Sequence, residues 1–186
     1  MNQEQLWNLL EATKSQIRSF DSKAQVALGI NSFLAGLLGS QLIKSTEYAA
    51  EGMLIRFWIT FIFSVVALGL VAYSFFWSLR TVHPQLRLSQ PKSHFFFCHL
   101  VERYGRDFYA AANALESLDE KTASHEIATQ IATNSVICDA KATRCRRALF
   151  SSGFALVLYL LTLLPFGSMA YEANHKTHLP QTILQK

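Results

Sequence analysis

Apolar and polar positions divide the chain into three long apolar segments separated by charged stretches. The apolar segments cover residues 24–43, 57–79 and 148–171, and none of them contains Asp, Glu, Lys or Arg. A helix needs about 20 apolar residues to cross the hydrocarbon core of a bilayer. The first segment is also longer than the apolar core of a cleaved signal peptide, which has about 7–15 residues. We therefore predict an all-α integral membrane protein with three transmembrane helices.

Composition agrees with this prediction. Hydrophobic residues make up 51% of the chain and charged residues 16%, and the mean hydropathy is +0.18. Soluble domains carry about 25% charged residues. The formal net charge of +4 is explained by a basic membrane-flanking region, so we expect no nucleic-acid partner.

The distribution of Lys and Arg predicts the orientation. Residues 80–147 hold ten of these residues and the leader 1–23 holds three, whereas the 44–56 connection and the 172–186 tail hold two each. Short loops rich in Lys and Arg stay on the cytoplasmic side. We therefore expect a cytosolic leader and a cytosolic 80–147 region, with an external 44–56 loop and an external tail.

Outside the three apolar segments, stripes at alternating steps of three and four residues predict amphipathic helices. The leader, the middle of 80–147 and its last part each have one such stripe. The middle helix would begin near Pro91, the polar stretch 118–126 would be a turn, and Ser124 would cap the last helix. These elements together predict a cytosolic helical bundle. The stripes are Leu6, Leu10, Thr13, Ile17, Phe20 and Ala24; Phe97, Val101, Tyr104, Phe108, Ala111, Leu115 and Leu118; and Ile127, Ile131, Asn134, Cys138, Lys141, Cys145 and Ala148.

A short sequence repeats itself where two of these helices approach the membrane. Asp21-Ser-Lys23-Ala24 precedes the first span, and Asp139-Ala-Lys141-Ala142 precedes the third. Residues two apart on a helix point to different sides, so cross-pairing of Asp21 with Lys141 and of Asp139 with Lys23 is the expected contact. Lys141 has two further interpretations: its head reaches water at the edge of the bundle, or it faces an anionic ligand.

The first span carries residues suited to helix association. Ser32, Gly36 and Ser40 form a face of small residues that permits close approach of a second helix. Asn31 lies in mid-span, where an amide in lipid needs a partner. An ordinary packed bundle would use the same features, and both interpretations stay open.

The chain contains no recognisable catalytic motif. Walker A, GxSxG, HExxH and CxxC sequences are absent. His94, Cys98 and His99 form the densest group of potential metal ligands, but zinc needs further ligands. We therefore predict neither an enzyme nor a metal site, and we interpret Cys98, Cys138 and Cys145 as reduced thiols.

The order of the parts resembles the Pycsar membrane effectors (PycTM), a bacterial family. The resemblance covers about residues 13 to 167. Its elements are the leader ending in Asp21-Ser-Lys23-Ala24, two spans, His83-Pro84, an aromatic run at 95–97, and a hairpin whose Asp139-Ala-Lys141 enters the last span.

What the resemblance implies is specific. Such effectors respond to cyclic UMP or cyclic CMP made by an adjacent pyrimidine cyclase during phage infection, and they impair the inner membrane so that infection is aborted. The resemblance places this chain in the bacterial inner membrane, where the external C-terminus predicted from Lys and Arg would be periplasmic. The implied ligand is 3',5'-cyclic UMP or 3',5'-cyclic CMP. A cation for the phosphodiester and an aromatic face for the base are needed. The candidates are Arg80, Arg87, Phe96, Arg103, Tyr104 and Lys141.

Structural roles could also explain these candidate residues, because arginines beside a membrane bind anionic lipid and phenylalanines at helical spacing pack in cores. Three helices cannot enclose a wide pore, so we expect a homo-oligomer. Two other functions remain open. One is a membrane scaffold or sensor subunit that binds a cytosolic partner through its helical bundle, and the other is a small pore that needs no ligand.

Overall fold

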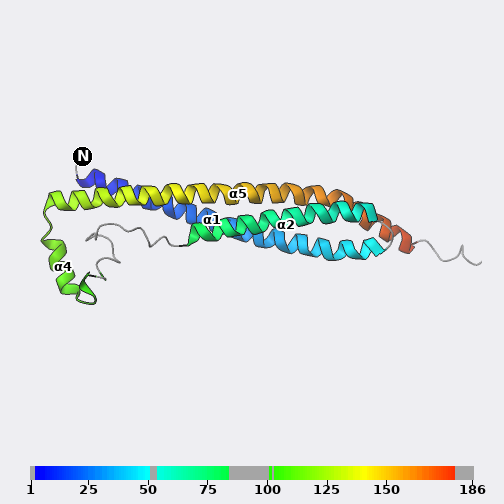
Figure 1. Cartoon of the computed structure of the whole chain (residues 1–186), viewed down its shortest axis with the longest axis horizontal. Helices are drawn as coiled ribbons and strands as arrows, with labels where there is room; N and C mark the ends of the chain where they lie inside the picture. Colours follow the sequence, from blue (N-terminus) through cyan, green and yellow to red (C-terminus); the bar gives the residue numbers. More distant parts are fainter. Residues whose placement is uncertain (1–2, 51–53, 84–100, 102, 179–186) are drawn as a thin grey trace, which may run out of the picture. The chain divides into compact units, whose positions relative to one another are not determined.

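The structure is a computed structural model that describes residues 3–50, 54–83, 101 and 103–178. Four helices account for most of these residues (Figure 1). They are α1 (Gln3–Ala50), α2 (Leu54–Val82), α4 (Phe108–Glu116) and α5 (Glu120–His178). No strand occurs in the described ranges, so the predicted all-α class is confirmed. The leader continues into the first span as one helix, as its stripe predicted, and much of the predicted 44–56 connection is also helical.

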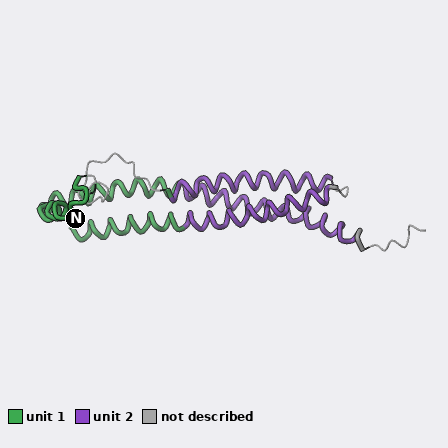
Figure 2. Tube along the Cα trace, turned by 90° about the horizontal axis from the view of Figure 1, so that it is seen from below, with its two compact units in different colours: residues 1–22, 83–143 green, residues 23–82, 144–186 purple. Residues whose placement is uncertain are grey.

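The chain divides into two compact units, coloured separately in Figure 2. Unit 1 comprises residues 1–22 and 83–143, and unit 2 comprises residues 23–82 and 144–186. Both α1 and α5 contribute residues to each unit.

Unit 1 has an apolar core between α1 and α5. Leu6, Leu10 and Ile127 are buried, and Ile131 packs against them. These residues come from the first and last predicted stripes, so the 3.6-residue periodicity identified the packing faces of both helices. Their burial supplies the hydrophobic stabilisation of this unit.

The predicted middle helix is interrupted. Gly105 has a φ of 61°, a left-handed conformation that favours glycine, and α4 begins afresh at Phe108. The Asp107 side chain caps α4 by accepting a hydrogen bond from the Ala110 backbone N–H. The prediction of one continuous middle helix was therefore wrong, because the Gly105 conformation ends a helix. α4 buries none of its residues, so a bundle that includes this helix stays a prediction.

The last helix starts earlier than predicted. α5 begins at Glu120, and the Asp119 carboxylate accepts a hydrogen bond from the Thr122 backbone N–H at 3.2 Å. Ser124 therefore lies inside the helix, and its predicted capping role was wrong. Hydrogen bonds from Thr122 hold the pKa of the Asp119 carboxyl below its ordinary value. An ionised side chain at this position also complements the positive end of the helix dipole.

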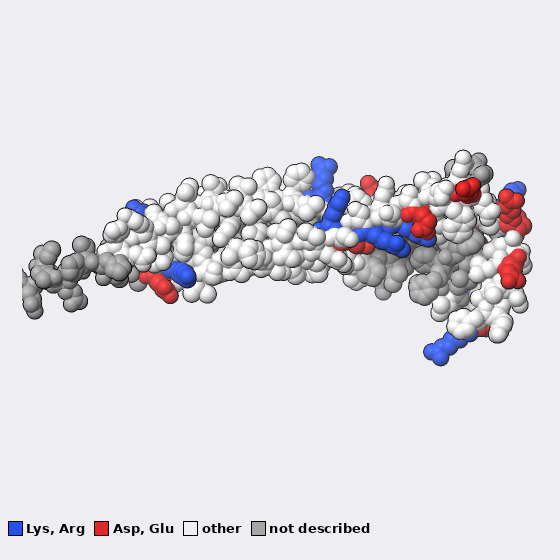
Figure 3. Space-filling view, turned by 180° about the vertical axis from the view of Figure 1, so that it is seen from behind, with Lys and Arg blue, Asp and Glu red and all other residues white. Residues whose placement is uncertain are grey.

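Unit 2 contains the three apolar segments side by side, one each from α1, α2 and α5 (Figure 2). All three helices are long and apolar enough to cross a membrane. Their outward side chains are large and apolar, and Figure 3 shows a long stretch of white atoms without Lys, Arg, Asp or Glu over this unit. Exposed Phe33, Ile62 and Phe154 illustrate this surface. Large exposed apolar side chains are what a lipid-facing helix requires.

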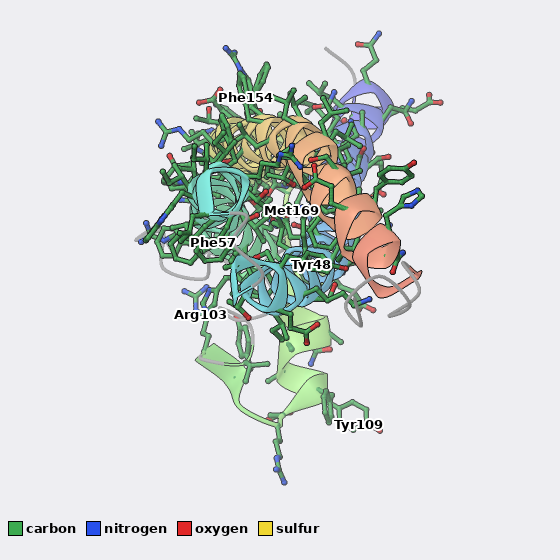
Figure 4. All side chains as sticks on the ribbon, turned by 90° about the vertical axis from the view of Figure 1, so that its right-hand side faces the viewer. Tyr48, Phe57, Arg103, Tyr109, Phe154 and Met169 are labelled. Atoms are coloured by element: carbon green, nitrogen blue, oxygen red, sulfur yellow. The ribbon has the colours of Figure 1, made fainter. Side chains whose placement is uncertain are left out.

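Inside unit 2, two apolar clusters lie at different levels. The first, called the apolar collar, consists of Leu34, Leu38, Ala67, Val71 and Ala155. The second contains Met169 and Ala173, with Tyr48, Phe57 and Phe166 packed against them. Figure 4 shows Tyr48, Phe57 and Met169 around the space between the helix ends, whereas Phe154 points outward.

One proline lies inside α5. Pro165 has no backbone N–H, so the carbonyl of Leu161 cannot receive its usual hydrogen bond from residue 165. The Thr162 hydroxyl, one turn before the proline, donates to the Tyr159 carbonyl at 2.6 Å. The Ser168 hydroxyl donates to the carbonyl of Pro165 at 2.8 Å. Side-chain hydroxyls thus bond to the backbone on both sides of the interruption.

Candidate functional site

An ion pair joins the two long helices within unit 1. Lys141 on α5 donates to the carboxylate of Asp21 on α1. The lysine side chain is only 6% exposed and the aspartate side chain 29%. This is the pairing that the repeated sequence predicted. A buried ammonium group is costly unless an anion compensates it, and Asp21 supplies that anion.

This pair changes the interpretation of Lys141 as a ligand-binding residue. Because its charge is already compensated, a phosphate at this place would have to displace or share Asp21. The other predicted pair, Asp139 with Lys23, joins residues of different units, and both side chains are exposed. That pair stays a prediction.

Arg103 and Tyr104 lie next to each other just before Gly105. The Arg103 guanidinium lies 5.9 Å from the centre of the Tyr104 ring, within the range of a cation–π contact. Arg103 is exposed and Tyr104 half-buried. Unit 1 therefore offers one cation beside one aromatic ring, the two groups that a cyclic nucleotide needs. Two other candidate ligand-binding residues, Arg87 and Phe96, lie outside the described residues.

Arg80, the remaining candidate, belongs to unit 2 and lies among other arginines. Its guanidinium is 5.4 Å from the Phe76 ring centre, and its carbonyl accepts a hydrogen bond from Arg144 at 3.2 Å. Arg147 lies 4.9 Å from the ring of Trp77. Arginine and tryptophan at one end of apolar helices are typical of a membrane boundary. The four described candidates are thus divided between the two units, with Arg80 in unit 2 and the other three in unit 1.

Among these arginines, Cys145 is buried in unit 2. Burial raises the pKa of its thiol above the ordinary value, although the charge of Lys23 opposes the shift. The shift favours the protonated form of the thiol, which is the less nucleophilic form. Cys138, the other described cysteine, is also free, and no group of metal ligands occurs in the described part of the chain.

The interior of unit 2 holds a closed group of polar side chains. Asn31 on α1 donates to the hydroxyl of Ser74 on α2 at 2.8 Å, and the hydroxyl of Ser152 on α5 donates to the Asn31 amide oxygen at 2.8 Å. Ser74 also donates to the Ala148 carbonyl, and the two serine hydroxyls lie 2.8 Å apart. We call Asn31, Ser74 and Ser152 the polar ring. It joins all three helices of unit 2.

A second polar contact lies further along the same helices. Gln41 on α1 donates to the carbonyl and to the hydroxyl of Thr162 on α5, at 3.2 and 3.0 Å. Both residues are buried. Amide side chains in lipid need such partners, so this contact fixes the register of α1 against α5.

The predicted association residues divide into two groups. Asn31 is fully buried and bonded within its own chain, which is the ordinary-bundle interpretation for this residue. Ser32, Gly36 and Ser40 are exposed on α1. A Cβ atom added to Gly36 would meet no atom within 4 Å. This face is therefore unoccupied by the chain itself, and its role in association stays a prediction.

Sequence reasoning missed the polar partners of Asn31. Ser74 and Ser152 were not singled out, nor were the other hydroxyls of α2. The available signal was the spacing of Ser and Thr along the second apolar segment and just after it, at positions 60, 64, 74, 78 and 81. These positions share one helix face, although small hydroxyl residues are common enough in transmembrane helices to escape notice.

Comparison with known families adds one finding. The family model described as "Pycsar effector protein domain" (PycTM) matches residues 5–166. No curated protein and no solved structure matches the chain. The matched range includes α1 from its third residue on, all of α2 and α4, and most of α5.

Proposed function

The chain belongs to the Pycsar effector family, and on that premise we propose that it is an antiphage effector activated by a cyclic pyrimidine nucleotide. Cyclic UMP or cyclic CMP, made by a partner pyrimidine cyclase, would bind outside the membrane-spanning segments. Activation would impair the integrity of the bacterial inner membrane and abort the infection. The observation that carries this proposal is the match over 5–166 together with three helices able to span a membrane.

The Arg103–Tyr104 contact is the strongest support for a nucleotide site. The guanidinium offers paired donors to a phosphodiester, and the ring offers a face to the pyrimidine. Their chain segment precedes α4, which buries none of its residues. Segments with few buried contacts are the parts of a protein that move most readily when a ligand binds.

Oligomerisation completes the proposal. Three helices from one chain fill their own interior, so impairment of the membrane requires several copies. Ser32, Gly36 and Ser40 supply a face of small residues for that contact. Gly36→Leu should abolish oligomers in a cross-linking experiment, while Phe33→Leu, on a neighbouring exposed position, should not. Unchanged oligomers in Gly36→Leu would remove this face from the proposal.

The proposed function is tested in bacteria that carry a membrane-potential dye. Cells express the chain together with a pyrimidine cyclase, either active or catalytically inactive. Depolarisation only with the active cyclase is expected. Continued growth without depolarisation in both cultures would instead support the membrane scaffold, which one observation favours: Phe108 and Tyr109 on α4 are 80% and 86% exposed, as Figure 4 shows for Tyr109.

The candidate ligand residues are tested by direct binding. Purified protein in detergent is titrated with cyclic UMP and with cyclic CMP, and Arg103→Gln is compared with Arg106→Gln. Both arginines are exposed, so neither change should unfold the chain. A loss of affinity in Arg103→Gln alone is expected. Equal affinity of both variants would exclude Arg103 from the site.

A further inference from the structure

The buried face of α2 is unusually rich in hydroxyl groups. Seven residues of this helix are buried, and five of them are Ser or Thr. The opposite face carries large apolar side chains such as Trp58, Ile62 and Phe76, all more than half exposed. α2 is therefore polar on its inner face and apolar on its outer face. The hydroxyl residues are Thr60, Ser64, Ser74, Ser78 and Thr81.

Three of these hydroxyls have no hydrogen-bond partner. They belong to Thr60, Ser64 and Ser78, whose side chains are fully buried. Helical Ser and Thr usually bond to a carbonyl one turn earlier, as Ser32 and Thr81 do here. A buried hydroxyl without a partner is rare in proteins and commonly marks a site for water.

The apolar collar interrupts this polar face. Val71 and Ala67 follow Ser74 toward the start of α2, and Leu34 and Leu38 follow Asn31 on α1. Beyond the collar the interior becomes polar again, with the Gln41–Thr162 contact. Two polar levels are thus separated by one apolar level.

From these observations we propose that the inner face of α2 lines a path for water and small ions, closed at the apolar collar. Hydrophobic constrictions in channels stop conduction by excluding water, and they conduct when they become hydrated. The inference rests on the proposed function, and it names the surface along which the membrane becomes permeable. In an assembly of several copies, activation would separate α2 from α1 and α5 of its own chain, so that each copy turns the inner face of its α2 toward the shared path.

The path is tested by thiol accessibility. In a chain with Cys98, Cys138 and Cys145 replaced by Ala, Ser64→Cys is placed on the proposed lining. Val66→Cys, two residues away and 49% exposed, is the matched control on the lipid-facing side. Spheroplasts with active or inactive cyclase are treated with a cationic, membrane-impermeant methanethiosulfonate reagent. A thiol reacts with such a reagent only where water ionises it.

With the active cyclase, we expect rapid modification of Ser64→Cys and at least tenfold slower modification of Val66→Cys. Depolarised cells without this difference would overturn the inference and keep the proposed function. Modification of Ser64→Cys in cells that do not depolarise would keep the water-lined face and overturn the proposed function. If Ser64→Cys is not modified and the cells do not depolarise, both the inference and the proposed function are overturned.

A second variant tests the collar without any ligand. Leu38→Asn places an amide in the apolar level, where Leu38 is fully buried. We expect it to depolarise cells that contain the inactive cyclase. Phe33→Asn, on a position that is 68% exposed, changes the lipid-facing side by the same residue type and should leave the potential intact. Equal leakage from both variants would overturn the proposed closure at the apolar collar. The same holds if Leu38→Asn inserts into the membrane and causes no leakage.

Discussion

The two units differ in what they bury, although α1 and α5 contribute to both. Unit 1 has a core of Leu6, Leu10 and Ile127. Unit 2 buries Asn31, Ser74 and other polar residues, and its exposed surface is apolar. The pattern of inside and outside residues is therefore partly inverted between the two units, although unit 2 also buries the apolar collar.

The inversion follows from the surrounding solvent. In water, removing apolar side chains from contact with solvent drives packing. In lipid the tails are as apolar as leucine, so close contact of small residues and hydrogen bonds hold helices together instead. The comparison also separates two candidate functional regions: the polar interior belongs to unit 2, and the contact of Arg103 with Tyr104 belongs to unit 1.

The largest expected effect comes from breaking the apolar core of unit 1. Ile127→Ala should lower its stability by about 2–5 kcal/mol, because a fully buried side chain is replaced by a cavity. Protease digestion of the leader in detergent-solubilised protein measures the loss. Leu9→Ala, at a position that is 46% exposed, is the control and should be digested at the wild-type rate. Equal digestion of both variants would contradict the assigned core.

The ion pair at Asp21 and Lys141 should give a smaller effect. Lys141→Met leaves Asp21 without its partner, and because Asp21 is 29% exposed we expect a loss of about 1–3 kcal/mol, below the value for fully buried pairs. The double variant with Asp21→Leu should recover most of it. Thermal unfolding followed by circular dichroism compares these variants with Lys14→Met, which removes an exposed contact with Glu11 and should change nothing measurable. Additive losses in the double variant would exclude the pair.

The polar ring of unit 2 should contribute less to stability than the ion pair does. Asn31→Leu removes two side-chain hydrogen bonds, and such bonds contribute about 0.6–2 kcal/mol in membranes. Unfolding in mixed micelles of increasing SDS content would report the loss, with the exposed Ser32→Ala as control. A gain of stability in Asn31→Leu would show that the unit tolerates an apolar interior, against the inversion described above.

The smallest effect is expected at the first turn of α5. The pKa of Asp119 is lower in the folded chain than in the unfolded chain. Its contribution is therefore fully present above the unfolded pKa of about 3.9, and it is lost as pH falls through the lower folded value. The protection of the Thr122 amide against hydrogen exchange, relative to an unfolded peptide at the same pH, should fall over this acidic window in the wild type. In Asp119→Ala this protection should already be lower at neutral pH and should change little in acid.

Much of the fold could be predicted from the sequence because two physical signals were strong. Long charge-free segments identified the three helices that are long and apolar enough to cross a membrane, and the stripes containing Leu10 and Ile127 identified faces that pack in unit 1. The Asp21–Lys141 contact followed from the repeated Asp-x-Lys-Ala sequence, because residues two apart on a helix point to different sides and so favour pairing between the two helices.

The remaining features depend on information that periodicity does not contain. The interruption at Gly105 is a backbone conformation at one residue, and the stripe through Tyr104 and Phe108 continued across it. Capping by Asp119 competed with Ser124, and both are good capping residues. Ser74 and Ser152 became notable only when α2 and α5 placed them beside Asn31. The ligand residues were the least predictable, because arginines serve lipid, structure and nucleotide equally well.

Pro165 has a mechanical consequence for α5. A regular helix resists bending along its whole length, since every turn is closed by backbone hydrogen bonds. At Leu161 one of these bonds is missing, so the elastic stiffness of α5 has its minimum there, and tilting of the segment that follows concentrates at this one turn. α5 therefore bends most easily next to the contact between Thr162 and Gln41. A force on the C-terminal end of α5 would act first on that contact.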